Sequence, residues 1–408
     1  MKRMLATSLL LAFSLNAWAG QSAKPAGNSK IMTFSPDVSA DARREIVRKA
    51  GGRVVRELPL IDGVEAEFPA FTLMSDVSLK AKREVASVEP NAYRNWLAAG
   101  PAALQSVVIP SAQQVLRQAM QNKASAPAIG EAEAKAEAAD PRIPWGVARV
   151  RASSAWSRTM GAGVKVAVVD TGIDYAHPAL SGNYKGGYNA VDPQADPKDD
   201  HGHGTHVAGT IAAAGEDILG VAPQASLYAV KVLDGSGGGT IAGIIDGLDW
   251  CVKNKLHIVN MSLGGPHSDA LQKAVEKTVA AGVTIVAAAG NDPEAEVSAP
   301  ARYPQTIAVS ASTSEDGLAY FSTTGPEVDF IAPGHQVPST WPGGGTKSLS
   351  GTSMATPHVT GLAVLAYALG ATSPDRVRTT LNGAAAPLGG LNAEQQGGGM
   401  IQADHFGR

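Results

Sequence analysis

Cysteine is almost absent from this sequence, since Cys251 is the single cysteine among 408 residues. One thiol cannot form an intrachain disulfide. It also excludes a structural zinc site built on cysteines, because such a site needs more than one thiolate. Cys251 follows Trp250 in a predicted helical stretch, which favours a small buried side chain over a reactive thiol.

Aromatic side chains and excess charge are scarce as well. Aromatic residues make up 5% of the chain, and 34 basic against 37 acidic residues give a net charge of −3. A protein that binds nucleic acid through phosphate contacts is usually strongly basic, so no nucleic-acid partner is expected. The 45 glycines and the 44% hydrophobic content indicate a folded α/β protein in which small residues pack closely.

After the N-terminal segment, the sequence has no apolar run of the roughly 18 residues that a membrane-spanning helix needs. The rest of the chain is therefore not expected to span a membrane. The N-terminus itself carries Lys2 and Arg3, an apolar stretch at 5–15 and the small-x-small pattern Ala-Trp-Ala at 17–19. This pattern predicts that residues 1–19 are a signal peptide, cleaved after its last residue. A buried N-terminal helix is the alternative. We therefore expect a secreted protein, extracellular or periplasmic, with no membrane partner.

Residues 30–96 have the pattern of a small α+β unit in the order βαββαβ, the ferredoxin-like arrangement. Ser39 can cap a helix that runs to Ala50 and stops at the glycines 51–52. The remaining expected elements are strands at 30–34, 53–58, 64–68 and 85–89 and a short helix at 75–83.

The composition changes at residue 97 and again at 141. Residues 97–140 are rich in alanine and predict a flexible linker, with one helical segment at 111–123. From 141 to 408, apolar runs with β-branched residues alternate with helical stretches, which predicts a mostly parallel sheet covered on both faces. The expected strands are 164–169, 226–232, 258–261, 283–289 and 306–310, and the expected helices are 205–214, 240–253 and 269–281.

Three polar motifs stand at predicted strand ends and helix starts, where ligands of such sheets bind. Asp170 follows the apolar run 166–169, although an Asp-x-Gly turn alone is common. His203 begins a small-residue helix, close to His201 and His206. These histidines favour catalysis by one imidazole, and a zinc site of all three is the alternative. Ser353 precedes a long apolar helix, where it is either a plain N-cap or a nucleophile aimed outward.

Together these fragments resemble the signature blocks of the subtilisin-like serine proteases. The blocks are Val-Ala-Val-Val-Asp-Thr-Gly at 166–172, His-Gly-Thr-His-Val-Ala-Gly-Thr at 203–210 and Gly-Thr-Ser-Met-Ala-Thr-Pro-His at 351–358. Shorter matches lie at 226–232, 259–265, 287–291 and 321–326. The resemblance covers about residues 141–405 and implies a three-layer α/β fold with a mostly parallel sheet. Residues 30–96 resemble the inhibitory prodomain of this family.

The resemblance implies a role for each motif residue. Ser353 matches the nucleophile, His203 the general base and acid, and Asp170 the carboxylate that orients the imidazole. Asn291 matches the side-chain donor of the oxyanion hole. Extended substrates of the family add a strand between two segments, and these correspond here to Gly235, Ser236 and Gly237 and to Ser262, Leu263 and Gly264.

The leading hypothesis is therefore a secreted, monomeric serine endopeptidase made as a zymogen. It would act on proteins or peptides, with its own prodomain as intramolecular inhibitor. A zinc hydrolase would leave the blocks around Asp170, Asn291 and Ser353 unexplained. A non-catalytic binding protein on the same scaffold usually lacks a triad residue, and all three are present here.

No cofactor is expected to be required, because the chain departs from its best-known relatives at their tightest calcium site. Ala179 stands where those relatives have an aspartate ligand, and the loop at 211–219 is two residues shorter. Calcium needs about six to eight oxygen ligands, so both losses weaken the same site. A weak site formed by Asp192, Asp196, Asp199 and Asp200 is the alternative to a simply solvated acidic loop.

Overall fold

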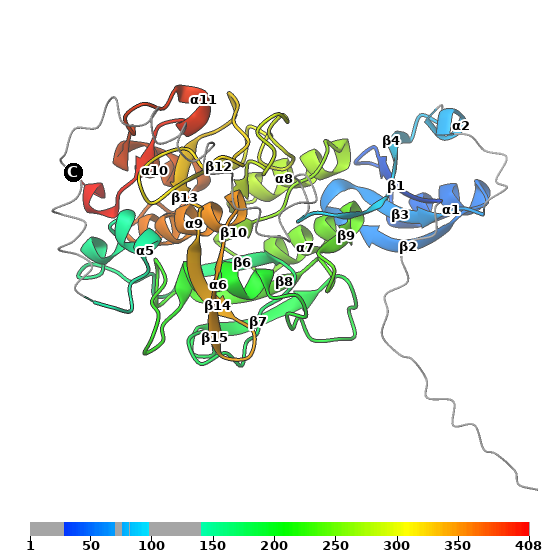
Figure 1. Ribbon diagram of the computed structural model, residues 1–408. Helices are drawn as coiled ribbons and strands as arrows, with labels where there is room; N and C mark the ends of the chain where they lie inside the picture. Colours follow the sequence, from blue (N-terminus) through cyan, green and yellow to red (C-terminus); the bar gives the residue numbers. More distant parts are fainter. Residues whose placement is uncertain (1–27, 70–75, 81, 98–139, 408) are drawn as a thin grey trace, which may run out of the picture.

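The computed structural model describes residues 28–69, 76–80, 82–97 and 140–407 (Figure 1). A small unit with its own sheet packs against one end of a larger α/β unit. The predicted signal peptide and the helical segment expected at 111–123 lie outside the described residues.

The small unit contains one antiparallel sheet in the order β2-β3-β1-β4. Strand β1 pairs antiparallel with both β3 and β4, which places Met32 opposite Val64 on one side and Val88 on the other. Ser39 caps α1 as expected, accepting a hydrogen bond from the N–H of Ala42 at 3.2 Å. The elements are β1 (Ser29–Phe34), α1 (Ala40–Lys49), β2 (Arg53–Leu58), η1 (Pro59–Ile61), β3 (Gly63–Glu67), α2 (Asp76–Lys80) and β4 (Val85–Pro90).

The large unit is built on a nine-stranded sheet in the order β16-β17-β13-β12-β11-β10-β6-β8-β7. All neighbouring strands are parallel except β16 and β17. The strands are β6 (Lys165–Asp170), β7 (Tyr184–Asn189), β8 (Ser226–Lys231), β10 (Ile258–Met261), β11 (Thr284–Ala288), β12 (Ile307–Ser312), β13 (Phe330–Pro333), β16 (Ala385–Ala386) and β17 (Met400–Ile401).

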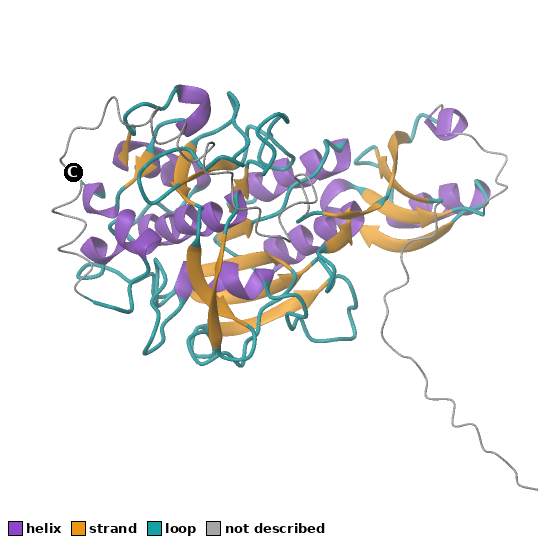
Figure 2. Ribbon diagram, viewed as in Figure 1, coloured by secondary structure: helices purple, strands orange, loops and turns teal. Residues whose placement is uncertain are grey.

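Helices cover both faces of this sheet (Figure 2), which confirms the predicted three-layer α/β fold. The sequence did not indicate the glycine-rich edge strand β7 or the hairpin of β14 (Val337–Trp341) and β15 (Gly345–Leu349). The helices are α5 (Trp145–Arg149), η3 (Ala152–Ala155), α6 (His203–Ala212), α7 (Ile241–Lys253), α8 (Asp269–Ala280), α9 (Thr352–Ala368), α10 (Pro374–Ala384), α11 (Ala393–Gln396) and η4 (Ala403–His405).

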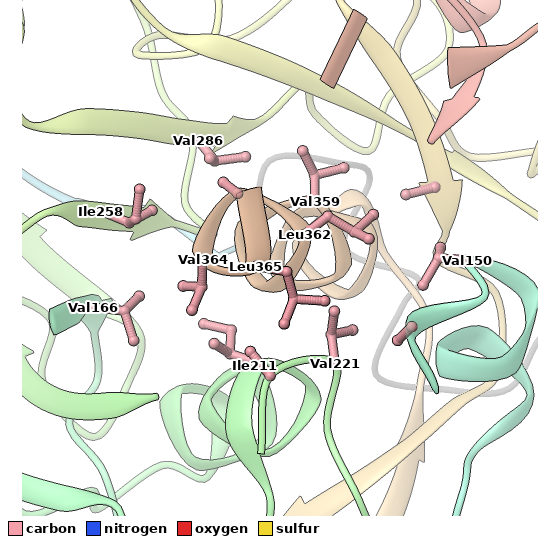
Figure 3. Packing of buried hydrophobic residues seen from close by; sticks show 14 of the residues in the cluster. Val150, Val166, Ile211, Val221, Ile258, Val286, Val359, Leu362, Val364 and Leu365 are labelled. Atoms are coloured by element: carbon pink, nitrogen blue, oxygen red, sulfur yellow. The ribbon is translucent and has the colours of Figure 1, made fainter. Parts of the chain in front are cut away.

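The two-residue period of each strand divides the core into two layers. In β6, Val166 and Val168 belong to the cluster that includes α6 and α9, whereas Ala167 and Val169 belong to the cluster of α7 and α8. Figure 3 shows α9 inside the first cluster, with Leu362 among its labelled core residues. Because α9 is apolar on nearly every side, its N-terminal end is held firmly beside the sheet.

The small unit contacts the large one through α7 and α8. Ile31, Leu58 and Ile61 are fully buried in the cluster formed by these two helices. At the N-terminal ends of the helices, the N–H of Ala242 donates to Asn91 Oδ1, and the N–H of Ala270 donates to Glu89 Oε1. Both contacts cap otherwise unpaired helix N–H groups.

Candidate active site

Asp170 brings a buried carboxylate to the carboxyl edge of the sheet. It is the last residue of β6, and its side chain is fully buried. The N–H of Thr171 donates to its Oδ1 at 2.7 Å, which fixes the carboxylate at the start of the following turn. The apolar run of β6 thus places a charge where the parallel strands end and where ligands of such sheets bind.

His203 is the first residue of α6 and lies directly against this carboxylate. Its Nδ1 is 2.8 Å from Oδ1 and 3.0 Å from Oδ2 of Asp170. Gly202 caps the helix with φ at 107°, and a Cβ there would lie 2.5 Å from the Trp341 ring, so only glycine fits this approach. Burial disfavours the charged imidazole, but the neighbouring Asp170 prevails and raises the pKa of His203.

Asp199 holds the loop that leads into His203, and the sequence did not single it out for this role. Its side chain accepts five hydrogen bonds, from Thr171 Oγ1, from the N–H groups of His201 and Gly202, and from the N–H and Oγ1 of Thr205. A buried carboxylate with so many donors is a structural anchor. Its position a few residues before a helix start was the only available signal.

The three neighbouring histidines do not converge on one point. The rings of His201 and His203 are 6.3 Å apart, and His203 Nδ1 is bonded to Asp170. His206 places Nε2 at 3.0 Å from the carbonyls of Val337 and Lys347, and burial lowers the pKa of His206 to about 3. Within the described residues, no group of three or more potential metal ligands is found. The geometry therefore gives no support to the zinc alternative.

Ser353 is the second residue of α9 and is almost fully buried. Its Oγ donates to the carbonyl of Ser262 at 3.1 Å, and Ser262 Oγ donates to the carbonyl of Ser353 at 2.9 Å. Asn260 Nδ2 also donates to Ser262 Oγ and so helps to orient the two reciprocal hydrogen bonds between Ser262 and Ser353. Among the residues that the structure describes, no hydrogen bond joins Ser353 to His203, so the hydroxyl is turned toward Ser262 in this state.

Asn291 lies beside Ser353 with a fixed amide orientation. Its Oδ1 accepts from the N–H of Thr352 at 2.8 Å and lies 3.0 Å from Thr352 Oγ1. The amide oxygen is therefore engaged by Thr352, and the Nδ2 group of Asn291 is oriented away from it as a donor for another acceptor. Thr352 also bonds with Gly290, two residues after β11 ends, and these bonds tie the start of α9 to the segment that follows β11.

An extended segment of the small unit lies in the predicted substrate groove. Strand β5 (Tyr93–Asn95) pairs antiparallel with β9 (Gly238–Thr240). The next residue, Trp96, donates its N–H to the carbonyl of Gly237 and accepts from the N–H of Gly264. Two segments of the large unit therefore sandwich the chain by main-chain hydrogen bonds.

The structure refines the six residues predicted to bind substrate. Gly264 and Gly237 make main-chain hydrogen bonds with Trp96, while Ser236 contacts Asn95 through its carbonyl. Ser262 forms hydrogen bonds with Ser353. Leu263, which lies between Ser262 and Gly264 in the sequence, is buried in the core. Among these contacts with the extended segment, none involves Gly235, because the paired strand begins three residues later than the sequence suggested, at Gly238, and extends to Thr240.

Cys251 is fully buried in α7, and burial raises the pKa of its thiol. This agrees with the interpretation of Cys251 as a small core residue. No helix in the described ranges is long and apolar enough to cross a bilayer.

Comparison with known proteins gives consistent matches to one family. The family model described as the subtilase family matches residues 161–403. The alkaline protease of Shouchella clausii is 45% identical over 285 residues, which are 68% of this chain and 74% of that protein. Subtilisin Savinase of Lederbergia lenta is 46% identical over 267 residues, or 64% and 97% of the two chains. Subtilisin E of Bacillus subtilis (strain 168) is 46% identical over 269 residues, or 64% and 70%.

Proposed function

Because the chain belongs to the subtilase family and is a serine endopeptidase, we propose that Asp170, His203 and Ser353 are its catalytic triad. The observation that carries this assignment is the buried contact between Asp170 and His203, at 2.8 Å, together with the position of Ser353 in the first turn of the buried helix α9. The acidic partner fixes the tautomer in which Nε2 is free to accept a proton.

In the proposed reaction, Ser353 Oγ rotates from the Ser262 carbonyl toward His203 when substrate binds. His203 accepts the hydroxyl proton as Oγ attacks the scissile carbonyl, and later protonates the leaving amine. Asp170 stabilises the imidazolium that forms between these steps. Catalytic hydrogen bonds are often absent before substrate arrives, so the rotated serine is compatible with this role.

Asn291 and the N–H of Ser353 form the proposed oxyanion hole. Thr352 occupies Asn291 Oδ1, which leaves Nδ2 as a preorganised donor for the developing negative charge. The N–H of Ser353 lies in the first turn of α9, where helix N–H groups have no partner within the helix. Both donors are held before the reaction, so little reorganisation is needed in the transition state.

Inactivation by a serine-directed phosphonyl fluoride tests this function directly. We expect stoichiometric loss of peptidase activity, with the label on Ser353 in a peptide map, because the activated hydroxyl alone attacks the reagent rapidly. A zinc chelator should leave the activity unchanged. Labelling of another residue, or inactivation by the chelator alone, would contradict the triad.

We further propose that residues 30–96 are a prodomain and that the protein is an autoprocessed zymogen. The support is the occupied groove, where β5 and Trp96 block the strand-pairing segments that a substrate would need. The cleavage that releases the enzyme would fall in the linker at 97–140. The signal-peptide pattern supports secretion, and the protein would act as a monomer on protein or peptide substrates, with a broad preference for large apolar side chains.

The isolated prodomain should inhibit the mature enzyme. We expect inhibition at micromolar or lower concentration, because the prodomain inserts Trp96, buries Ile31, Leu58 and Ile61, and caps α7 and α8. Steady-state rates at increasing prodomain concentration measure this. As a matched comparison, Trp96→Ala in the added prodomain should raise the inhibition constant at least about 100-fold, since it removes a fully buried aromatic anchor. No inhibition at micromolar prodomain would refute the proposal.

The residues present do not fit the tight calcium site of the best-known relatives. Ala179 is buried in a small apolar cluster with Ala213 and Ile218, so no carboxylate stands at this position. A Cβ at Gly215 would lie 2.8 Å from the Ala179 Cβ, which shows how closely the shortened loop packs here. Oxygen ligands are thus replaced by van der Waals contacts, and we propose that no cofactor is required.

The acidic loop is also largely committed to protein contacts. Asp199 accepts the five hydrogen bonds described above, Asp200 pairs with Lys231 at 2.6 Å, and Asp192 accepts from the N–H of Gln194. Asp196 is within 3.4 Å of the Tyr175 hydroxyl. These contacts favour a solvated structural loop over a calcium site.

Calcium should therefore stabilise the mature enzyme only modestly. We expect micromolar calcium to raise the Tm of the Ser353→Ala protein by less than about 4 °C relative to EDTA, roughly the effect of 1 kcal/mol in a domain of this size. Thermal melts in both buffers measure the shift. A large shift lost in Asp196→Asn would instead place calcium in the acidic loop.

A further inference from the structure

Residues 93–97, which we call the tail of the small unit, contact the large unit through side chains as well as through the backbone. Tyr93, the first residue of β5, donates its hydroxyl to Asp234 Oδ2 at 2.5 Å. The Tyr93 hydroxyl oxygen also lies 2.9 Å from Ser236 Oγ. The phenol group is thus held between a carboxylate and a hydroxyl of the large unit.

Asp234 is fixed by its own loop in a way that leaves one oxygen for this contact. Its Oδ1 accepts from the N–H and Oγ of Ser236 at 2.8 and 2.7 Å and from the N–H of Gly238 at 3.2 Å. Partial burial opposes ionisation, but the hydrogen bonds from Tyr93 and Ser236 prevail and lower the pKa of Asp234. The loop therefore holds the Asp234 carboxylate in a fixed orientation, and the hydrogen bond from Tyr93 itself favours the ionised form.

Gly238 supplies the space for the tyrosine ring. A Cβ at this position would lie 2.1 Å from the Tyr93 hydroxyl oxygen and 2.3 Å from the adjacent ring carbon. Gly238 is not among the residues with positive φ, so its backbone conformation does not itself demand glycine. Glycine is needed at this position because the Tyr93 ring occupies the space that a side chain would fill.

A second aromatic anchor sets the register of the tail. Trp96, three residues after Tyr93, is 1% exposed and donates Nε1 to the carbonyl of Gly239 at 3.1 Å. A Cβ at Gly265 would lie 2.6 Å from its ring. Each of the two aromatic side chains, three residues apart in the tail, therefore packs against a glycine of the large unit: Tyr93 against Gly238 and Trp96 against Gly265.

We propose that Asp234, Ser236 and Gly238 form a distal specificity subsite of the mature protease, which takes a tyrosine three residues before an aromatic anchor. The substrates favoured by this subsite are extended protein segments with the pattern Tyr-x-x-Trp, bound as the tail is bound. The proposal rests on the proposed function, because the groove must bind substrate after the prodomain leaves. The hydroxyl distinguishes tyrosine from phenylalanine, since the partly buried Asp234 carboxylate would otherwise face an apolar ring edge without this donor.

The test uses two peptides that copy residues 91–106, one natural and one with phenylalanine at the position of Tyr93. Their competition constants are measured on the mature enzyme against a short chromogenic peptide substrate, so the readout does not require that they are cleaved. We expect the natural peptide to bind about tenfold more tightly, the effect of one hydrogen bond to a partly exposed charged acceptor. Equal constants for the two peptides would overturn the subsite.

Enzyme variants complete a double-mutant cycle. In Asp234→Ala the tenfold preference for tyrosine should vanish, and in Asp375→Ala, which removes an exposed carboxylate in the first turn of α10, it should persist. Gly238→Ala should weaken both peptides, because the added Cβ displaces the ring whether or not it carries a hydroxyl. A preference that survives Asp234→Ala would overturn the assignment. Failure to hydrolyse the chromogenic substrate would instead remove the proposed function on which the subsite rests.

Discussion

Replacing Ser353 with alanine is expected to lower kcat about 10⁶-fold, the magnitude measured for the corresponding serine in subtilisin and adopted here for its relative. In the proposed triad, Ser353 Oγ is the nucleophile whose proton His203 accepts. Without the serine hydroxyl, a water molecule would have to attack the scissile carbonyl, and no residue of the proposed site is placed to hold that water in position. The residual activity would come from substrate binding and the oxyanion hole alone.

The same substitution should leave the fold intact and block maturation. Ser353 Oγ makes one hydrogen bond, to the carbonyl of Ser262, so its loss is expected to cost about 1 kcal/mol in the free energy of unfolding. Purified Ser353→Ala should therefore keep a cooperative melt and retain its prodomain, as N-terminal sequencing would show.

Ser314→Ala provides the matched control, because Ser314 is an exposed serine whose Oγ donates to the neighbouring Glu315 side chain. That variant should mature and act like the wild type. Retention of a tenth of wild-type activity by Ser353→Ala would remove Ser353 from the role of nucleophile.

The layers of the fold and the motif residues of the site could be predicted because each has a local signature. The run before Asp170 is apolar at every position, as expected for a strand buried on both faces, and the small residues after His203 and Ser353 fit closely packed helices. The parallel arrangement places all strand ends on the same side, and there Asp170 at the end of β6 contacts His203 at the start of α6.

Features that depend on partners far away in the sequence could not be predicted in this way. Tyr184–Asn189 contains two glycines and no continuous apolar run, yet it forms an edge strand because β8 supplies the hydrogen-bonding partner. The substrate strand was expected at 235–237, but Asp234 folds that turn through its own hydrogen bonds and moves the pairing to 238–240. The turn of Ser353 toward Ser262 likewise depends on a segment 91 residues away.

Replacing Asp170 with asparagine is expected to lower kcat/KM about 10⁴-fold near neutral pH while the site keeps its shape. Asparagine is nearly isosteric, and its carbonyl oxygen can still accept from the N–H of Thr171. Its amide group would then donate toward His203 Nδ1 and stabilise the tautomer that has its proton on Nε2. In that tautomer, Nε2 already carries a proton and cannot accept the one that the proposed mechanism transfers from Ser353.

The pH dependence of this variant separates the role of Asp170 from simple structural damage. Protonated His203 cannot act as a base, so kcat/KM rises as the pH increases through the pKa of His203. Asp170 raises that pKa against the opposing effect of burial, so the wild-type midpoint should lie above the usual histidine value of about 6.5. In Asp170→Asn the raising charge is gone and burial remains, so the midpoint should move to lower pH. Profiles of kcat/KM between roughly pH 4 and pH 10 measure both midpoints.

Asp192→Asn is the matched control, because its carboxylate only accepts from the exposed loop at Gln194 and its loss should leave the profile unchanged. A variant that merely distorted the site would lose activity at every pH without moving the midpoint. An unchanged midpoint in Asp170→Asn would therefore mean that another group controls the acidic limb. A loss of less than about tenfold would show that Asp170 does not orient His203, because the wrong tautomer alone should reduce the rate far more.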